Sequence, residues 1–275
     1  MDDKSRIEVT VVVPIKEFTM NLDMTLRSIL EQVYVNFEVI LILHPQLKSE
    51  ISNLENYLRF PNVKHFFQEK PGLYEGMNDG WIRAKDSYIC FMGVGDFFLS
   101  NEVFLSVTSE LKSYSPKSLA WGYGPWLFLD SLGGIIFPAL DQSFDTSDLL
   151  KNTTPICHQT VFMSKSLLQR LGGFDISLRV ASDRDLLDRA AQIAAPRVWS
   201  ETITAYVDGG FSAINQTIGH KELECLQNLR KDVTYKKVGL LGNLRLKLEN
   251  WRWKKSECLH HYEWLPIDIL RFLND

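Results

Sequence analysis

The sequence predicts an α/β fold, in which a Rossmann-like, mostly parallel sheet is flanked by helices and followed by a mixed second half and a helical C-terminal appendage. Two observations support this class. Apolar, β-branched runs alternate with segments of helical period over the first hundred residues, which is the pattern of βαβ units with right-handed crossovers. Farther along, short apolar runs are separated by glycines and a proline, which is typical of a meander. We expect one domain over residues 1–215, divided near residue 100, and a helical extension over 216–275.

Four strands are predicted in the first half, and the first, second and fourth of them are apolar runs typical of buried strands. They are Ile7 to Ile15, Phe37 to Leu43, Val63 to Phe67 and Tyr88 to Met92. Pro14 should end the first strand, because proline cannot donate to a ladder.

Three helices should connect these strands. The first has an apolar face that includes Leu22, Leu26 and Ile29, with Asn21 or Thr19 as its N-cap. A weaker helix spans Ile51 to Phe60. The third carries apolar residues at helical spacing: Tyr74, Met77, Trp81 and Ala84.

The second half predicts shorter elements. A helix follows Asn101 through Leu111, Ser164 caps a short helix that ends at Gly172-Gly173, and helices resume from His220. Strands are expected at Leu119 to Trp121, Pro125 to Leu129, Gly134 to Phe137 and His158 to Met163. Another helix begins at Ser182, where Ser182 and Asp185 have the spacing of a capping box.

The composition restricts partners and location. A net charge of −4 argues against nucleic acid as the main partner. The N-terminal residues lack the features of a signal peptide, and no apolar stretch approaches the ~20 residues that cross a bilayer. We therefore expect a cytoplasmic protein, or one peripheral to the inner face of the membrane. The four cysteines are Cys90, Cys157, Cys225 and Cys258. Their wide spacing indicates buried reduced thiols rather than zinc ligands or a dithiol.

One stretch combines the features of a ligand site. Gly72 opens a turn, the helix with Tyr74 follows, and the next buried strand ends at Gly95-Asp96. Open α/β sheets bind ligands outside the carboxyl ends of their strands, so Asp96 is placed where a ligand should lie. No G-x-G-x-x-G follows the first strand, so the chain lacks the key feature of a dinucleotide-binding oxidoreductase.

The order of motifs resembles the inverting nucleotide-sugar glycosyltransferases of family 2, which have the GT-A fold. Four matches occur in order between residues 7 and 212: the helix over 72–80 (G-L-Y-E-G-M-N-D-G for G-I-Y-D-A-M-N-x-G), Asp96 in the acidic motif, Gly172-Gly173-Phe174-Asp175 before Asp183-x-Asp185, and Gly209-Gly210-Phe211-Ser212 for G-G-x-S. The resemblance implies a sugar-nucleotide half over 1–100 and an acceptor half over 101–215.

The resemblance also implies roles for particular residues. Asp183 would be the general base that deprotonates the acceptor hydroxyl. Asp96 would bind Mn²⁺ or Mg²⁺, which stabilises the departing diphosphate, and His158 is a second candidate at the metal. The candidate donor-binding residues are Pro14, Lys16, Glu17, His44, Gly72, Tyr74, Asn78 and Gly95.

The implied substrates are a nucleoside-diphosphate sugar, with a UDP-sugar as the first expectation, and a hydroxyl of a glycan or lipid-linked acceptor. Direct displacement would invert the anomeric configuration. The family's bacterial members suggest assembly of a surface polysaccharide or lipopolysaccharide.

Three positions depart from the family pattern. His44 replaces the usual aspartate after the second strand, and Gly95 replaces the first acid of the acidic pair. Pro14-Ile15-Lys16-Glu17 replaces P-T-Y-N, so Lys16 either faces phosphate or is a solvated charge like Glu17. An impaired homologue that binds a sugar nucleotide or glycan without turnover is therefore the alternative. A nucleotidyltransferase is less well supported. Such an enzyme usually has a glycine-rich, basic loop after the first strand, and Pro14-Ile15-Lys16-Glu17 is not such a loop.

Several residues keep two interpretations. His158 is either a packed histidine or a group near the acceptor or metal, and Asp183 could serve only the helix dipole. Trp121 and Tyr123 either line the acceptor side or belong to the core. In the extension, an apolar stripe with nearby lysines and arginines could dock on the domain or lie on an anionic membrane surface. The stripe consists of Leu241, Leu244, Leu248 and Trp251. The oligomeric state is not predicted.

Overall fold

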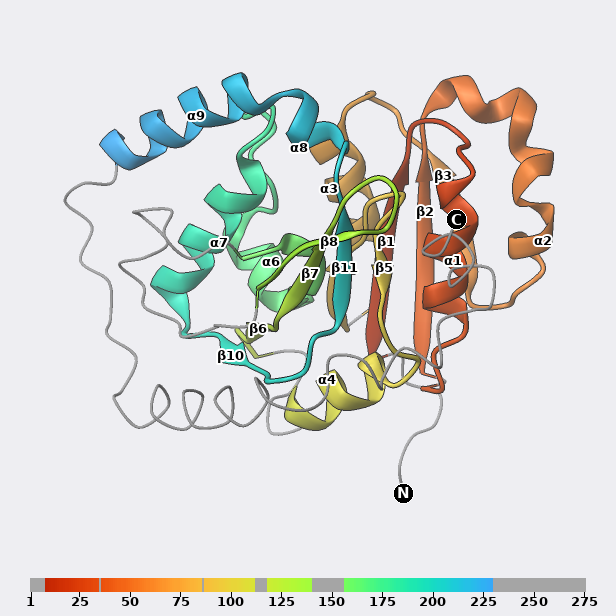
Figure 1. The fold of residues 1–275 in the computed structure, drawn as a ribbon, viewed down its shortest axis with the longest axis horizontal. Coiled ribbons are helices and arrows are strands. Elements are labelled where there is room, and N and C mark those ends of the chain that lie inside the picture. Colours follow the sequence, from red (N-terminus) through yellow and green to blue (C-terminus); the bar gives the residue numbers. More distant parts are fainter. Residues whose placement is uncertain (1–7, 35, 86, 112–117, 140–155, 230–275) are drawn as a thin grey trace.

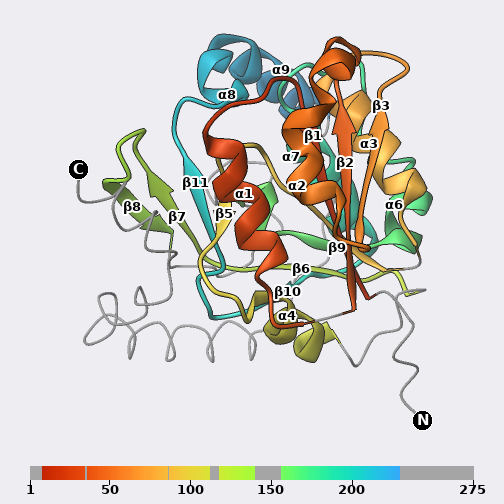
Figure 2. The ribbon, with the colours of Figure 1, turned by 90° about the vertical axis from the view of Figure 1, so that its right-hand side faces the viewer.

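The computed structural model describes residues 8–34, 36–85, 87–111, 118–139 and 156–229. Figure 1 shows a twisted sheet with helices on both of its faces, and Figure 2 shows a smaller sheet beside it. The larger sheet has seven strands in the order β10-β6-β9-β4-β1-β2-β3, and the smaller has four in the order β5-β11-β7-β8. The fold is therefore mixed α/β, as the sequence predicts.

The first half forms the parallel part of the larger sheet. Its strands are β1 (Val9–Ile15), β2 (Phe37–Leu43), β3 (Val63–Phe67) and β4 (Tyr88–Phe91). β1 pairs in parallel with both β2 and β4, and β2 pairs in parallel with β3, which confirms the predicted βαβ units. The prediction that Pro14 ends β1 is wrong: Pro14 is aligned with Ile42 of β2. The last residue of β1 that pairs with β4 is Val12. Pro14, which has no N–H to donate, is therefore tolerated two residues later.

Alternate residues of β1 serve two separate apolar layers, as expected for a strand buried on both faces. Val11 and Val13 pack with helices α1 (Asn21–Leu30) and α4 (Val103–Leu111). Val12 packs on the opposite face with helix α3 (Leu73–Arg83). A β-carbon at Gly80 of α3 would lie 2.2 Å from Val12 Cγ1, so this glycine allows α3 to approach the sheet closely.

The second half is mixed. Its strands are β5 (Phe97–Phe98), β6 (Trp121–Tyr123), β7 (Trp126–Leu129), β8 (Ile135–Ala139), β9 (Phe162–Ser164), β10 (Arg197–Val198) and β11 (Thr204–Val207). Its helices after α4 are α6 (Lys165–Leu171), α7 (Ser182–Ile193), α8 (Phe211–Ile214) and α9 (Gln216–Leu229). The predicted strand from His158 is wrong at its start, because His158–Thr160 forms the 3₁₀ turn η2 and β9 begins only at Phe162. Trp121 and Tyr123 are buried in the core beside α3, α6 and α7, which favours the core interpretation.

The weaker helix predicted after β2 is divided. The 3₁₀ segment η1 (Pro45–Leu54) is followed by the short helix α2 (Glu55–Leu58). Two predicted caps are wrong. Met20 occupies the N-cap position of α1 and Ala181 that of α7, and neither makes a side-chain cap hydrogen bond. The cap predicted for α6 is confirmed, since Ser164 accepts a hydrogen bond from the Leu167 N–H.

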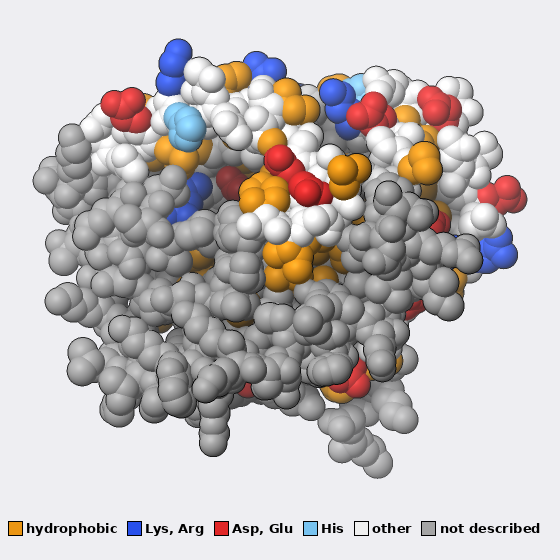
Figure 3. Space-filling view, in the orientation of Figure 1, with side chains coloured by type: hydrophobic (Ala, Val, Ile, Leu, Met, Phe, Trp, Pro, Cys, Tyr) orange, Lys and Arg blue, Asp and Glu red, His pale blue; other side chains and the backbone are white. Residues whose placement is uncertain are grey.

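The charged surface, the thiols and the lengths of the helices complete the description of the fold. On the face in Figure 3, basic and acidic side chains of the described residues are interspersed. Cys90 and Cys157 are buried free thiols as expected, but Cys225 is exposed, so that part of the prediction is wrong. Of the helices in the described ranges, none combines the length and apolar character that crossing a bilayer requires. Cys258 and the apolar stripe of the extension lie outside the described residues.

Candidate active site

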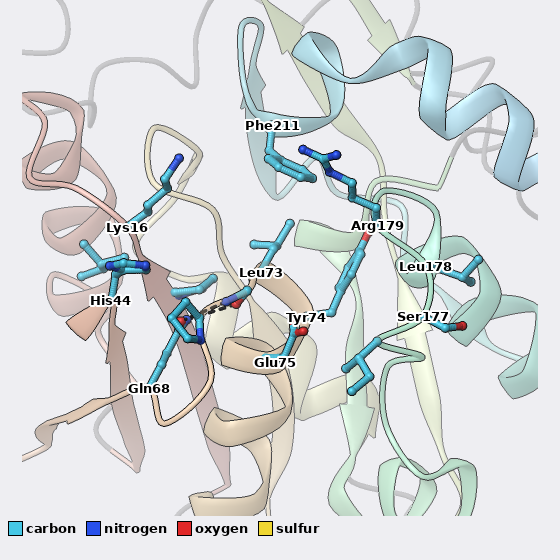
Figure 4. A pocket seen from close by; sticks show the side chains of 15 residues that line it. Lys16, His44, Gln68, Leu73, Tyr74, Glu75, Ser177, Leu178, Arg179 and Phe211 are labelled. Carbon is cyan, nitrogen blue, oxygen red and sulfur yellow. Dashed lines mark hydrogen bonds between the residues drawn. The ribbon is translucent and has the colours of Figure 1, made fainter. Parts of the chain in front are cut away.

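A cavity of about 480 Å³ opens where β1, β2 and β3 end (Figure 4). One wall comes from the segments after these strands and the start of α3, and the other from the segment before α7 and from α8. The lining residues are Pro14, Ile15, Lys16, His44, Gln68, Pro71, Gly72, Leu73, Tyr74, Glu75, Ile176, Ser177, Leu178, Arg179 and Phe211. The cavity is of the size that holds a small molecule, and it lies at the edge of the sheet where α/β folds bind ligands.

Local hydrogen bonds hold the first wall. The Gln68 side-chain amide donates to the Gly72 carbonyl and accepts from the Gly72 N–H, both at 3.2 Å. His44 Nδ1 accepts from the Gln46 N–H at 3.3 Å, and the Gln46 amide donates to the Lys16 carbonyl at 2.9 Å. The bond from Gln46 ties the loop after β2 to the loop after β1. The two bonds of Gln68 close the loop after β3 on itself. Much of this wall is therefore held by the chain's own contacts.

Five of the eight predicted donor-binding residues line this cavity: Pro14, Lys16, His44, Gly72 and Tyr74. Glu17, Asn78 and Gly95 are not among its lining residues.

Asn78 is used inside the fold. Its amide donates to the Phe174 carbonyl and accepts from the Phe174 N–H, both at 2.9 Å, and it also accepts from Trp81 Nε1. Asn78 therefore fastens the Gly172–Asp175 turn to α3.

Asp96 lies beyond β4 as a buried carboxylate. Its Oδ1 accepts from the Val207 N–H at 3.0 Å, and its Oδ2 accepts from Gln159 Nε2 at 2.5 Å. Burial raises the pKa of Asp96 to about 6, although the two hydrogen bonds and the nearby His158 act in the opposite direction. Each carboxylate oxygen has a second lone-pair direction, so each can still accept one further partner.

The backbone before Asp96 explains why a glycine stands at position 95. Gly95 has φ = 104°, a conformation that side chains rarely adopt. Thr25 Oγ1 accepts from the Gly95 N–H and donates to the Asp96 carbonyl, both at 2.9 Å. The turn is thus anchored to α1, and an aspartate at position 95 would be strained in it.

Asp183 stands in the first turn of α7, with about a quarter of its side chain exposed. Its Oδ2 is 3.3 Å from His158 Nδ1, and its Oδ1 accepts from the Arg184 N–H at 2.8 Å. The Tyr74 hydroxyl lies 3.4 Å from Oδ1. Burial acts to raise the pKa of Asp183, but the hydrogen bond and charge of His158 and the Arg184 N–H outweigh it, so the pKa is lowered. The carboxylate is therefore ionised near neutral pH, as a proton acceptor must be.

These groups form one electrostatic neighbourhood. His158 lowers the pKa of both Asp96 and Asp183. The pKa of Tyr206 is raised to about 12, chiefly by burial and then by nearby negative charges that include both carboxylates. Tyr74 joins the neighbourhood to the cavity, because it lines the cavity and contacts Asp183.

A divalent metal fits this neighbourhood only with help from a ligand. Within the described ranges, no three His, Cys, Asp or Glu side chains are grouped to hold a metal by themselves. Asp96 retains lone pairs, and the buried His158 Nε2 has no hydrogen-bond partner among the residues described. Mg²⁺ is commonly bound by one or two carboxylates together with substrate phosphates, so this donor set is sufficient if a diphosphate completes it.

Several site residues were missed by sequence reasoning. They are Gln68, Gln159, Arg179 and Phe211, which line the cavity or orient Asp96. Gln159 follows the predicted His158 directly, and Phe211 lies inside the matched glycine turn, so these two had a signal. Gln68 and Arg179 carried none.

Asp185, the second acid in the first turn of α7, has a structural role. Its carboxylate binds Arg189 Nε and Nη2 at 2.7 Å. The same guanidinium donates to the Leu171 and Gly173 carbonyls at 2.7 and 2.8 Å. The predicted capping role of Asp185 is therefore replaced by a bridge from α7 to the end of α6.

Comparisons with known proteins agree with a glycosyltransferase-like chain. No protein-family model matches the sequence. Two proteins of Mycobacterium tuberculosis described as uncharacterized glycosyltransferases are 28% identical over 133 residues, or 48% of this chain. The match spans about half of these relatives, 49% of their length. A PGL/p-HBAD biosynthesis glycosyltransferase of Mycobacterium bovis is 23% identical over 219 residues, covering 78% of this chain and 81% of the relative.

Solved glycosyltransferases share the fold at low sequence identity. Staphylococcus aureus TarS in complex with UDP-GlcNAc gives a TM-score of 0.66 at 12% identity, covering 97% of this chain and 81% of that one. The mannosyltransferase PcManGT of Pyrobaculum calidifontis, in complex with GDP-Man and Mn²⁺, gives 0.60 at 16% identity, with 98% and 81% covered. At these identities the similarity establishes the fold alone, and the chemistry has to be inferred from the residues of this chain.

Proposed function

We propose that this protein is an inverting glycosyltransferase of family 2 with the GT-A fold. It transfers a sugar from a nucleoside-diphosphate sugar to a hydroxyl of a glycan or lipid-linked acceptor. The observation that carries the proposal is the ionised Asp183 carboxylate, held by His158 and joined through Tyr74 to a cavity at the carboxyl edge of the sheet. A base beside a preformed nucleotide-sized cavity is what this reaction requires.

In this proposal the cavity binds the nucleotide. Lys16 supplies positive charge for phosphate, and His44 faces the base. Because His44 Nδ1 accepts from the Gln46 N–H, its Nε2 carries the proton when the ring is neutral. A donor there suits a carbonyl oxygen of a base, which uracil, thymine and guanine all present. This pattern is compatible with the UDP-sugar expected first and does not exclude a GDP-sugar.

Asp183 would take the proton of the acceptor hydroxyl as that oxygen attacks the anomeric carbon. Its lowered pKa keeps it able to accept the proton, and the contacts to His158 and the Arg184 N–H fix its orientation. Attack opposite the leaving diphosphate inverts the anomeric configuration.

Asp96, with His158 beside it, would hold Mn²⁺ or Mg²⁺ together with the donor phosphates. The metal, when bound, supplies Lewis-acid stabilisation of the departing diphosphate. Gln159 and the Val207 N–H keep the Asp96 carboxylate in one orientation for this purpose.

The names of the relatives support a role in assembling a surface glycolipid or polysaccharide, since one is named for PGL/p-HBAD biosynthesis. A lipopolysaccharide is a further acceptor of this kind. We also propose that the chain acts in the cytoplasm or at the inner face of the membrane, where sugar nucleotides are made.

A second function is favoured by one observation. Asp96 already accepts two hydrogen bonds and has Gly95 in place of a second acid, which suits a homologue that binds a sugar nucleotide or glycan without turnover. Titration calorimetry with UDP, GDP and dTDP, each with and without Mn²⁺, tests the donor site. If the protein is a glycosyltransferase, one nucleotide should bind more tightly in the presence of Mn²⁺, and Asp96→Ala should remove this effect of the metal.

The matched control is Asp79→Asn, since Asp79 pairs with Arg83 at 2.8 Å and does not line the cavity. Binding of none of the three nucleotides to the wild type would refute a donor site of this kind. Equal binding with and without metal would refute the role of Asp96.

A further inference from the structure

The segment just before α7 is held by a carboxylate from a distant helix. Glu222 of α9 accepts hydrogen bonds from three consecutive backbone N–H groups: Arg179 at 2.7 Å, and Val180 and Ala181 at 2.9 Å each. Hydrogen bonds to an ionised acceptor are the strong ones, and here one carboxylate receives three. Glu222 therefore holds the segment that leads into α7, whose N-cap residue, Ala181, makes no side-chain cap bond.

The same segment is also fixed from other directions. The Tyr74 hydroxyl donates to the Val180 carbonyl. Gly219 of α9 packs so close to Val180 that a β-carbon there would lie 3.1 Å from Val180 Cγ1. α9 and α3 thus hold the chain between them, and Asp183 follows only two residues after Ala181.

The first residue of this segment, Arg179, also lines the cavity. In Figure 4 its guanidinium lies on the side of Phe211, and Lys16 stands on the opposite side of the cavity. Among the residues that the structure describes, no carboxylate forms a salt bridge with either side chain. The Glu75 carboxylate, the acidic group among the lining residues, lies back against Gly72. Two cations therefore face the cavity from its two walls.

This arrangement suits a diphosphate. A guanidinium presents N–H donors in a planar fork that matches phosphate oxygens, and an ammonium adds a second, less directional charge. Because the Arg179 backbone is held by Glu222, the start of its side chain is fixed before a ligand arrives, which lowers the ordering cost of binding.

We propose that Arg179 binds the diphosphate of the donor nucleotide and that Glu222 is the positioning residue that presents it. The proposal rests on the proposed function, because it assumes that the cavity is the nucleotide site. It assigns α9 a role in the donor site, although none of its residues lines the cavity.

The first test compares a nucleoside diphosphate with its nucleoside. The diphosphate is whichever of UDP, GDP and dTDP the wild type binds most tightly by calorimetry, and the nucleoside is followed by ligand-observed NMR. Arg179→Met should weaken diphosphate binding by roughly tenfold to a hundredfold, as expected for charge-assisted hydrogen bonds, and leave nucleoside binding unchanged. Arg179→Lys should recover part of the loss. Arg170→Met, on the exposed side of α6, is the control and should bind like the wild type.

The second test addresses Glu222. Glu222→Gln puts an NH₂ group against backbone N–H donors, so the three N–H groups cannot all keep their partner. We expect roughly tenfold weaker diphosphate binding with unchanged nucleoside binding, while Glu224→Gln, an exposed position on the same helix, has no effect.

The outcomes separate this proposal from the proposed function. Wild-type binding of no nucleotide would overturn both. Nucleotide binding that Arg179→Met leaves intact would overturn only the role of Arg179. Loss of nucleoside and diphosphate binding together in Glu222→Gln, or no loss at all, would overturn the positioning role.

Discussion

The buried Asp96 carboxylate should make the protein less stable as the pH rises. Burial raises its folded-state pKa to about 6, from an ordinary value of 3.8 for an aspartate. A group whose pKa is raised on folding binds its proton more tightly in the folded state, so stability is lost as pH rises from the unfolded towards the folded pKa. A shift of about 2 pH units corresponds to about 3 kcal/mol at ~1.4 kcal/mol per unit.

Asp183, with its lowered pKa, contributes the opposite trend. The effect of Asp96 is therefore isolated by subtracting the unfolding free energy of Asp96→Asn from that of the wild type at each pH. Asparagine places an N–H₂ group near the Val207 N–H or the Gln159 amide. That cost does not vary with pH, so it offsets the two curves without changing how their separation depends on pH.

Urea unfolding of both proteins at intervals between pH 4 and pH 8, without added metal, measures the difference. We expect the unfolding free energy of the wild type, relative to that of Asp96→Asn, to fall by about 2 to 3 kcal/mol as the pH rises over this range. Most of the fall should occur below pH 6.5. A separation that stays constant within 0.5 kcal/mol, or that moves in favour of the wild type, would show that Asp96 is not held in a desolvated site.

Two further predictions concern the contacts that support the site. Asn78→Ala removes three hydrogen bonds to Phe174 and Trp81, and should cost about 2–4 kcal/mol in urea unfolding, whereas Asn78→Asp keeps the acceptor and should cost less. Equal losses in the two variants would contradict this. Gly80→Ala should also destabilise the protein, by about 1–2 kcal/mol, because overpacking against Val12 outweighs the better helix propensity of alanine. A higher melting temperature for Gly80→Ala would count against the close packing of α3 on β1.

The sequence was most informative where local pattern and burial agree. β2 and β3 begin and end at the predicted residues. β2 is a nearly continuous apolar run that is buried throughout between β1 and β3. β3 is the edge strand, and only its first residue, Val63, is buried. The buried face of α3 was also predicted correctly, since Tyr74, Met77 and Trp81 recur at helical spacing and pack on the sheet.

Features that depend on partners distant in sequence were not predictable from local pattern. Ser182 and Asp185 have the spacing of a capping box, but the backbone N–H groups before α7 bind Glu222, which lies some forty residues later. Likewise, the hydrogen bond between Gln159 and Asp96 joins residues 63 apart. The residues that could be named in advance lie in a recognisable motif or directly after a predicted strand. Their supporting contacts required the folded chain.

The most direct test of the central claim is to measure turnover and nucleotide binding side by side in the wild type and in Asp183→Asn. Nucleoside diphosphate released from UDP-, GDP- and dTDP-sugars with Mn²⁺ reports turnover, and calorimetry reports binding. If Asp183 is the general base, Asp183→Asn should bind nucleotide like the wild type and lose turnover by about 10²-fold or more, while the Asp79→Asn control keeps both. Turnover within a few-fold of the wild type in Asp183→Asn would contradict its role as the base. A wild type that binds a sugar nucleotide but never releases the diphosphate would identify a binding protein instead.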